Sequence, residues 1–267
     1  IPTVNARNIP LRSTKFYEDI SVFQRIYSST GELINTKQFT EGILPLKNTF
    51  FQITFAEEVE LSAKYFAVVS SEWHSVPFDV KYVQEKEVLP NGQQGEKLVD
   101  NKARVEVSLK EGLKPSSKYK IVIKKIINPN LTEDVVVNYD SAQPLQIKDF
   151  TYVSNTEMCV YFTNDLYDWG YPSSPEEWQR NIDAISIAPK AIIRGLNKYI
   201  NYDSSSPQVC PQKWGLIGYL LNVRLDPNTK YSIAFRTGMT DKYGSSLASE
   251  FSKPITSGAL KETDKYL

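Results

Sequence analysis

The sequence predicts an all-β protein of two tandem β-sandwiches, with one short helix inserted in the second. Segments in which apolar and polar residues alternate recur along the 267-residue chain, and a period of two is typical of strands that bury one face. One strand-and-turn pattern occurs twice. A chain of this length also favours two domains, because single cores usually stop growing at about 250–300 residues.

An internal repeat divides the chain into two related units. Leu113–Ile123 aligns without a gap with Leu225–Phe235, and Leu, Pro, Lys, Tyr and Ile coincide in the two segments. Upstream, Phe51–Phe55 resembles Met158–Phe162. Because the order of these segments is the same in both halves, each half is expected to form one sandwich.

The boundary between the units is expected at Asp140–Pro144, a polar stretch with a proline between two strand-like segments. The predicted domains are residues 1–143, a sandwich with an N-terminal hairpin extension, and residues 144–258, a sandwich with an aromatic and helical insertion. Residues 259–267 would begin a following segment. The chain starts at Ile1 without Met or an apolar leader, which indicates either a removed targeting segment or, as we favour, a piece of a longer protein.

Several segments of the first unit resemble strands. Ile20–Tyr27 and Leu33–Phe39 predict a hairpin around Ser29–Gly31 that either opens the first sandwich or belongs to a preceding region. Phe78–Val88 predicts a strand, and the turn cluster Pro90–Gly95 joins it to the next one. In Arg104–Leu109 every second residue is apolar, so one face of that strand is expected to be buried.

The repeated turn is followed in each unit by a strand that starts with a tyrosine. Pro115 and Pro227 suit the turn, because the φ of proline is fixed and no ladder N–H is needed there. The side chains expected to face inward are those of Tyr119, Ile121 and Ile123 in the first unit and Tyr231, Ile233 and Phe235 in the second.

One short helix is predicted at Ser174–Ile182, in an insertion between strands of the second unit. Ser174 suits the N-cap and Pro175 the first helical position. Glu177 lies three residues after the N-cap and completes a capping box. These signals together favour a helix that begins at this point.

The repeated Leu-x-Pro-x-(Ser/Thr)-Lys-Tyr segment resembles the corner before the sixth strand of immunoglobulin-like and fibronectin-type-III-like sandwiches. The resemblance implies that the hydroxyls of Tyr119 and Tyr231 hydrogen-bond back across the turn as structural corners. Thr237–Leu247 with Phe251 is similar to the close of bacterial Ig-like domains, and Ile53–Val59 is similar to their early strand.

The resemblance is good over 217–257, fair over 49–127 and poor over 1–45. It implies tandem bacterial Ig-like domains, which occur as spacers and binding modules in large cell-envelope or secreted proteins. Adhesins, surface-layer proteins and bacterial relatives of α2-macroglobulin are examples. The first copy departs from the pattern, because Asn128–Asp134 lacks the Gly-Asp-Gly set. Since a fold does not fix a function, the resemblance leaves the partner open.

The two cysteines, Cys159 and Cys210, are either free buried thiols or one disulfide. The disulfide is favoured because the rest of the chain resembles a secreted protein. It would tie an early strand of the second unit to the loop before Leu221–Leu225, and closing that loop would stabilise the fold by roughly 4 kcal/mol. An extracytoplasmic location (periplasmic, secreted or at the cell surface) is expected accordingly.

The charge balance argues against several classes of partner. The chain has 31 Lys and Arg residues against 31 Asp and Glu residues. This balance removes the electrostatic attraction that dominates binding to nucleic acids and to anionic membranes. No apolar run approaches the roughly 20 residues that cross a bilayer as a helix. The expected partner is a protein or another cell-surface component, with a carbohydrate as the alternative.

Candidate catalytic and metal-ligating residues are few. His74 is the only histidine, and no Gly-x-Ser-x-Gly segment or glycine-rich phosphate loop occurs. We therefore expect no enzyme activity and no cofactor. One histidine and two cysteines in scattered segments are a poor zinc site. Asn164, Asp165 and Asp168 could hold calcium, although solvated turn residues are the favoured interpretation and no metal is expected.

Aromatic residues crowd the second unit and give the candidate binding site. Exposed Trp and Tyr form protein interfaces and stack on sugars, whereas the interpretation we favour is a small core that packs the helix onto the sandwich. The expected function is a non-catalytic spacer or protein-interaction module, with a carbohydrate-binding module as the alternative. The candidate binding residues are Tyr167, Trp169, Tyr171, Trp178 and Trp214.

Overall fold

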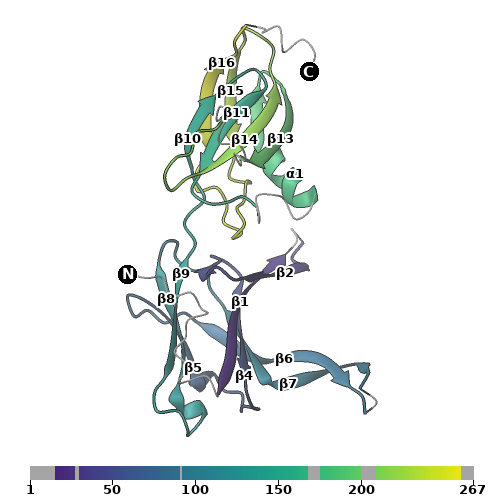
Figure 1. The fold of residues 1–267 in the computed structure, drawn as a ribbon, viewed down its shortest axis with the longest axis vertical. Helices are drawn as coiled ribbons and strands as arrows, with labels where there is room; N and C mark the ends of the chain where they lie inside the picture. Colours follow the sequence, from purple (N-terminus) through teal and green to yellow (C-terminus); the bar gives the residue numbers. More distant parts are fainter. Residues whose placement is uncertain (1–15, 28–29, 91, 168–174, 200–208, 260–267) are drawn as a thin grey trace. The chain divides into compact units, whose positions relative to one another are not determined.

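The chain divides into two units, Ile1–Ala142 and Gln143–Leu267, and each is built mainly from β-strands (Figure 1). A computed structural model describes residues 16–27, 30–90, 92–167, 175–199 and 209–259. The all-β prediction is confirmed. The predicted short helix is also present, as α1 (Pro175–Asp183). Ser174, its expected N-cap, lies outside the described residues.

Two sheets form the first unit. Their strands are β1 (Tyr17–Tyr27), β2 (Leu33–Phe39), β3 (Ile43–Leu44), β4 (Thr49–Phe55), β5 (Phe66–Ser70), β6 (Phe78–Val88), β7 (Gln94–Leu109), β8 (Lys118–Ile123) and β9 (Val135–Ser141). The first sheet has the order β2–β1–β4–β7–β6, with antiparallel neighbours throughout. The second has the order β3–β9–β8–β5, in which only β3 pairs in parallel. Short 3₁₀ turns lie at Ala63–Tyr65 and Lys125–Ile127.

The predicted N-terminal hairpin is β1 and β2, which pair with each other in antiparallel. Because β1 also pairs with β4, the hairpin belongs to the first sheet rather than to a preceding region. In β7, Val105 and Val107 are fully buried as expected, but the alternation is incomplete. Glu106 between them is also buried and pairs with Arg25, and Leu109 is only half-buried. Phe51 of β4 and Tyr139 of β9 have ring centroids 5.5 Å apart, which links the two sheets through the core.

Two further sheets form the second unit. Their strands are β10 (Ile147–Tyr152), β11 (Glu157–Phe162), β12 (Ile185–Ala188), β13 (Ile192–Lys198), β14 (Ile217–Arg224), β15 (Lys230–Phe235) and β16 (Phe251–Thr256). One sheet has the order β10–β11–β14–β13 and the other β12–β15–β16, with antiparallel neighbours throughout. The helix α1 is inserted between β11 and β12.

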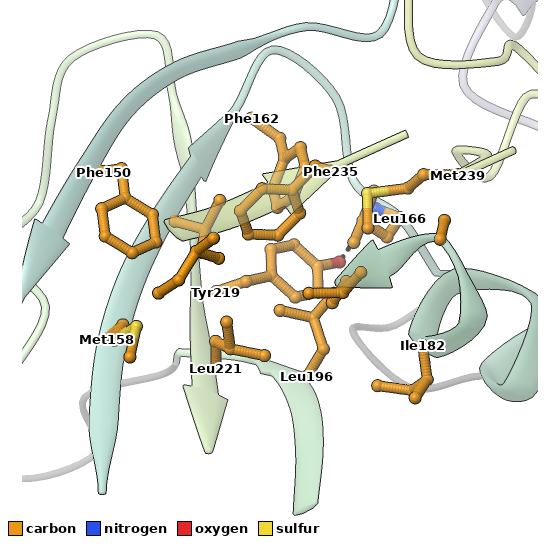
Figure 2. Close-up of a cluster of buried hydrophobic side chains, with 14 of the residues drawn as sticks. Phe150, Met158, Phe162, Leu166, Ile182, Leu196, Tyr219, Leu221, Phe235 and Met239 are labelled. Atoms are coloured by element: carbon orange, nitrogen blue, oxygen red, sulfur yellow. Dashed lines mark hydrogen bonds between the residues drawn. The ribbon is translucent and has the colours of Figure 1, made fainter. Parts of the chain in front are cut away.

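The core of the second unit lies between these two sheets (Figure 2). Phe150 of β10 and Phe235 of β15 have ring centroids 6.2 Å apart and so connect one sheet to the other. Tyr219 of β14 is fully buried among these side chains. Its hydroxyl accepts a hydrogen bond from the Leu166 N–H at 2.9 Å, which satisfies a polar group that burial would otherwise leave unpaired (Figure 2).

Both units share one strand order. The series β1–β4–β7–β6 in the first unit corresponds to β10–β11–β14–β13 in the second, and β5–β8–β9 corresponds to β12–β15–β16. The repeated segments of the sequence fall on equivalent strands, since Phe51–Phe55 lies on β4 and Met158–Phe162 is on β11. The first unit adds β2 and β3 to the common order, and the second adds α1.

The two repeated turns are closed in the same way. The Tyr119 hydroxyl accepts a hydrogen bond from the Lys114 N–H at 2.8 Å. The Tyr231 hydroxyl accepts one from the Asp226 N–H at 2.9 Å. A serine that the sequence did not single out adds a second bond to each turn. In the first unit the Ser141 hydroxyl donates to the Lys114 carbonyl, and in the second the Ser257 hydroxyl donates to the Asp226 carbonyl, both at 2.6 Å.

Candidate functional site

Of the five predicted binding residues, the structure describes Tyr167, Trp178 and Trp214, and these three differ in exposure. Tyr167 is fully buried, with its ring centroid 6.1 Å from that of Tyr219, so it is a core residue and not a binding residue. Trp178 of α1 is partly buried against the same core, in agreement with the small-core interpretation. Trp169 and Tyr171 lie outside the described residues. The remaining residue, Trp214, is fully exposed, and a candidate site can be built around it.

The strand β11 is buried on both faces. Its residues Met158, Val160 and Phe162 belong to the core between the sheets, whereas Cys159 and Tyr161 are buried in a second cluster. Such a strand is apolar at every position, which explains the unbroken Met-Cys-Val-Tyr-Phe run. The loop between β13 and β14 provides the cover on the second face, through Tyr199, Val209, Cys210 and Leu216.

We call residues 209–216 the stapled loop, because covalent and polar contacts hold them on β11. Cys210 forms a disulfide with Cys159, with the Cα atoms 5.5 Å apart, so the predicted disulfide is confirmed. One residue further, the carbonyl of Pro211 accepts a hydrogen bond from the Tyr161 hydroxyl at 2.9 Å. These two contacts fix the first half of the loop against the sheet.

A tight turn in the second half of the stapled loop presents Trp214 to solvent. The Leu216 N–H donates to the Lys213 carbonyl at 3.1 Å, which closes a four-residue turn. Gly215 has a φ of +70°, and this left-handed value at the third position is typical of a type II turn. Trp214 occupies the position before it, where the residue is fully exposed.

Two ion pairs accompany the turn. Lys213 Nζ donates a hydrogen bond to Asp149 of β10 and lies 4.5 Å from the ring centroid of Tyr161. This hydrogen bond lowers the pKa of Asp149 and raises the pKa of Lys213, so both groups are charged at neutral pH. In the second pair, Lys198 Nζ lies 2.8 Å from Asp165 Oδ1. Each ammonium is therefore balanced by one carboxylate.

A pocket of about 620 Å³ opens beside Trp214. Its volume lies within the range of about 300–1,000 Å³ that is common for small-molecule sites. The lining combines aromatic rings, ammonium groups and backbone of the stapled loop. Besides Trp214, it includes Tyr161, Lys198, Tyr199, Gln212, Lys213 and Leu216.

The other candidate chemistry of the sequence does not converge. His74 is exposed, with Nδ1 3.3 Å from Glu72. Asn164 Nδ2 donates to Asp241 at 2.6 Å, Asp165 pairs with Lys198, and Asp168 lies outside the described residues. Within the described ranges, no group of three or more His, Cys, Asp or Glu side chains could hold a metal ion. No helix in the same ranges is long and apolar enough to span a membrane.

Sequence reasoning missed the residues that surround Trp214. Asp149 and Lys213 are far apart in the chain, and they meet only because the stapled loop is held over the sheet. One local signal was present, because Gly215 suits the third position of a type II turn, which requires a positive φ. No protein-family model and no curated protein matches the sequence, so the assignment of this site depends on its own geometry.

Proposed function

We propose that the chain is a tandem immunoglobulin-like module of an extracytoplasmic or cell-surface protein, and that it acts without catalysis as a spacer or protein-interaction domain. The strand order carries this proposal. In constant-type immunoglobulin sandwiches, strands A, B, E and D form one sheet and strands C, F and G form the other. Lettering β10 to β16 from A to G places the second unit in that order, and the common strands of the first unit follow it too.

The disulfide supports an extracytoplasmic location. Disulfides persist in oxidising compartments and are rare in the cytosol, where thiols are kept reduced. Cys159 and Cys210 lie in the buried cluster of the second unit, away from the surface chemistry expected of a redox-active pair. A structural cross-link of this kind suits a module that works outside the cytoplasm.

A projecting arm supports the protein-interaction role. The distal parts of β6 and β7 pair only with each other, beyond the point where β4 leaves the sheet, and run out from the first unit (Figure 1). Val88, Leu89 and Leu98 are exposed on this arm. Apolar side chains that protrude on a thin ribbon are suited to burial against a partner.

Single-molecule stretching tests the spacer role. Two independent sandwiches in series should unfold in two separate events under oxidising conditions. The second unit should release less chain than its length allows, because the disulfide spans a sequence separation of 51 residues. Reduction should lengthen one event alone, by roughly 18 nm at about 3.6 Å per residue.

The double variant Cys159→Ser with Cys210→Ser is the matched control, and it should show the longer event without any reductant. A single cooperative unfolding event for the whole chain would contradict two units that bear load in series. A reduced chain that gains no length would contradict the placement of the cross-link within the second unit.

A further inference from the structure

Trp214 combines full exposure with a rigid support, and the proposed spacer role uses neither property. An exposed tryptophan on a flexible loop would lose conformational freedom whenever it bound a ligand. Here the disulfide, the hydrogen bond from Tyr161 to Pro211 and the contact between Lys213 and Asp149 hold the stapled loop before any ligand arrives. The ring is therefore presented in advance, at the edge of a pocket.

The charges around the pocket favour an uncharged ligand. Lys213 and Lys198 each carry a carboxylate partner, Asp149 and Asp165, so little net positive charge is left to attract an anion. An ammonium has three N–H donors, and a side-chain amide has both donors and an acceptor oxygen. Lys198, Lys213 and Gln212 line the pocket, whereas the carboxylates of Asp149 and Asp165 do not, so the ammonium groups supply donors and the Gln212 amide supplies an acceptor as well. Hydroxyl groups, which donate and accept, match this combination well.

The face of the Trp214 indole provides a second kind of contact, which is packing against a sugar ring. The face of an aromatic ring is electronegative, and it packs favourably on C–H groups that carry partial positive charge. A pyranose ring has one side rich in such C–H groups and hydroxyls around its rim. A flat ring at the rim of a pocket with balanced polar groups inside is complementary to that combination.

We propose that the pocket beside Trp214 binds a neutral carbohydrate, with the indole as stacking platform and Lys198, Lys213 and Gln212 as hydrogen-bonding partners of the sugar hydroxyls. This site goes beyond the spacer role and does not depend on it. A phosphorylated or carboxylated ligand is disfavoured by the paired lysines, and a protein partner is one of the outcomes that the experiment separates.

The experiment is calorimetric titration of the oxidised chain with neutral oligosaccharides, namely gluco-, xylo-, manno- and N-acetylglucosamine hexamers, at up to about 10 mM. Oligogalacturonate serves as the anionic comparison. At least one neutral oligosaccharide should bind with a stoichiometry of one. Raising the salt from 0.15 to about 0.5 M should change its affinity less than about twofold, because the charges of the site are already compensated.

Trp214→Ala should weaken that binding by about tenfold or more. Trp73→Ala is the matched control, since Trp73 is 79 % exposed but lies in the first unit, and it should leave binding unchanged. Gly215→Val keeps the indole but strains the turn at its positive φ, and it should weaken binding as well. Thermal unfolding of each variant shows whether the second unit is still folded.

Three results would overturn the proposal. One is that none of the neutral oligosaccharides binds, and another is that Trp214→Ala binds as tightly as the unsubstituted chain. The third is a preference for oligogalacturonate that salt abolishes, which would assign the pocket to anions. None of these results changes the two unfolding events expected under force, so failure here is distinguishable from failure of the spacer role.

Discussion

Tyr119 of β8 and Tyr139 of β9 lie opposite each other in the ladder of the first unit, and both are buried. Their hydroxyls have different surroundings. The Tyr119 hydroxyl accepts the Lys114 N–H at the repeated turn, whereas among the described residues no hydrogen-bond partner is present for the Tyr139 hydroxyl. Burial raises the pKa of Tyr139, so its hydroxyl stays protonated and unpaired in the core. Removing the two hydroxyls should therefore have different effects on the stability of the first unit.

We expect Tyr119→Phe to lower the free energy of unfolding of the first unit by roughly 1–2 kcal/mol, because the ring stays but the Lys114 N–H loses its partner. Tyr139→Phe is the matched control and should cause no loss, since it removes a buried group without a partner. Tyr231→Phe should act on the second unit as Tyr119→Phe does on the first. Differential scanning calorimetry measures all three. Equal losses for Tyr119→Phe and Tyr139→Phe would contradict the assignment.

At the scale of elements, the β6–β7 arm differs from the other strand pairs. The pairing of β4 with β7 ends at Arg104. From Val83 opposite Asn101 to Val88 opposite Gln94, the arm is a ribbon of two strands. A ribbon of this kind contributes little to a fold, because two strands alone are at best marginally stable in water.

Joining Lys86 to Leu98, which are partners in the ladder, through a two-residue Asn-Gly turn removes the distal arm and keeps the hairpin. We expect the stability of the first unit to change by no more than about 0.5 kcal/mol, as for other surface changes. Phe51→Ala, in the core of the same sheet, should instead cost about 3–5 kcal/mol. Urea unfolding measures both variants. A shortened chain as unstable as Phe51→Ala would mean that the arm is part of the core.

Local signals explain how much of these elements the sequence could predict. The helix was found from Pro175 and Glu177, and the first hairpin from two strand-like segments around a turn at Ser29–Gly31, because both patterns arise within a few residues. Burial on a second face of β11 was not found, although the run Met158–Phe162 is apolar throughout. Tyr167 was both a candidate binding residue and part of the favoured small core, and its burial agrees with the core. Its contact with Tyr219 of β14 could not be read from sequence periodicity.

At the scale of the whole molecule, the cross-link is confined to one of two cores. Cys159 and Cys210 both lie in the second unit, and the first unit has no cysteine. Stability gained by constraining the unfolded chain should therefore be confined to the second unit. The two units can be distinguished by this property in one experiment.

Calorimetry of the oxidised and reduced chain should show two transitions, of which reduction lowers only one. The expected loss is about 2–4 kcal/mol for the second unit, because its unfolded chain regains the freedom of the loop. The double variant Cys159→Ser with Cys210→Ser should match the reduced chain and be insensitive to reductant. If both transitions moved together on reduction, the two units would fold as one cooperative body.

The arm of the first unit and the stapled loop of the second lie at equivalent connections of the common strand order. In the common strand order β6 and β7 correspond to β13 and β14, so each unit elaborates the link between its fourth and fifth common strands. One link is a long ribbon and the other a cross-linked loop, yet the flanking strands keep their places. The two units of this chain therefore differ at this connection while the strands on either side of it keep their order. For protein engineering, it is the position in either unit at which to graft a new recognition loop.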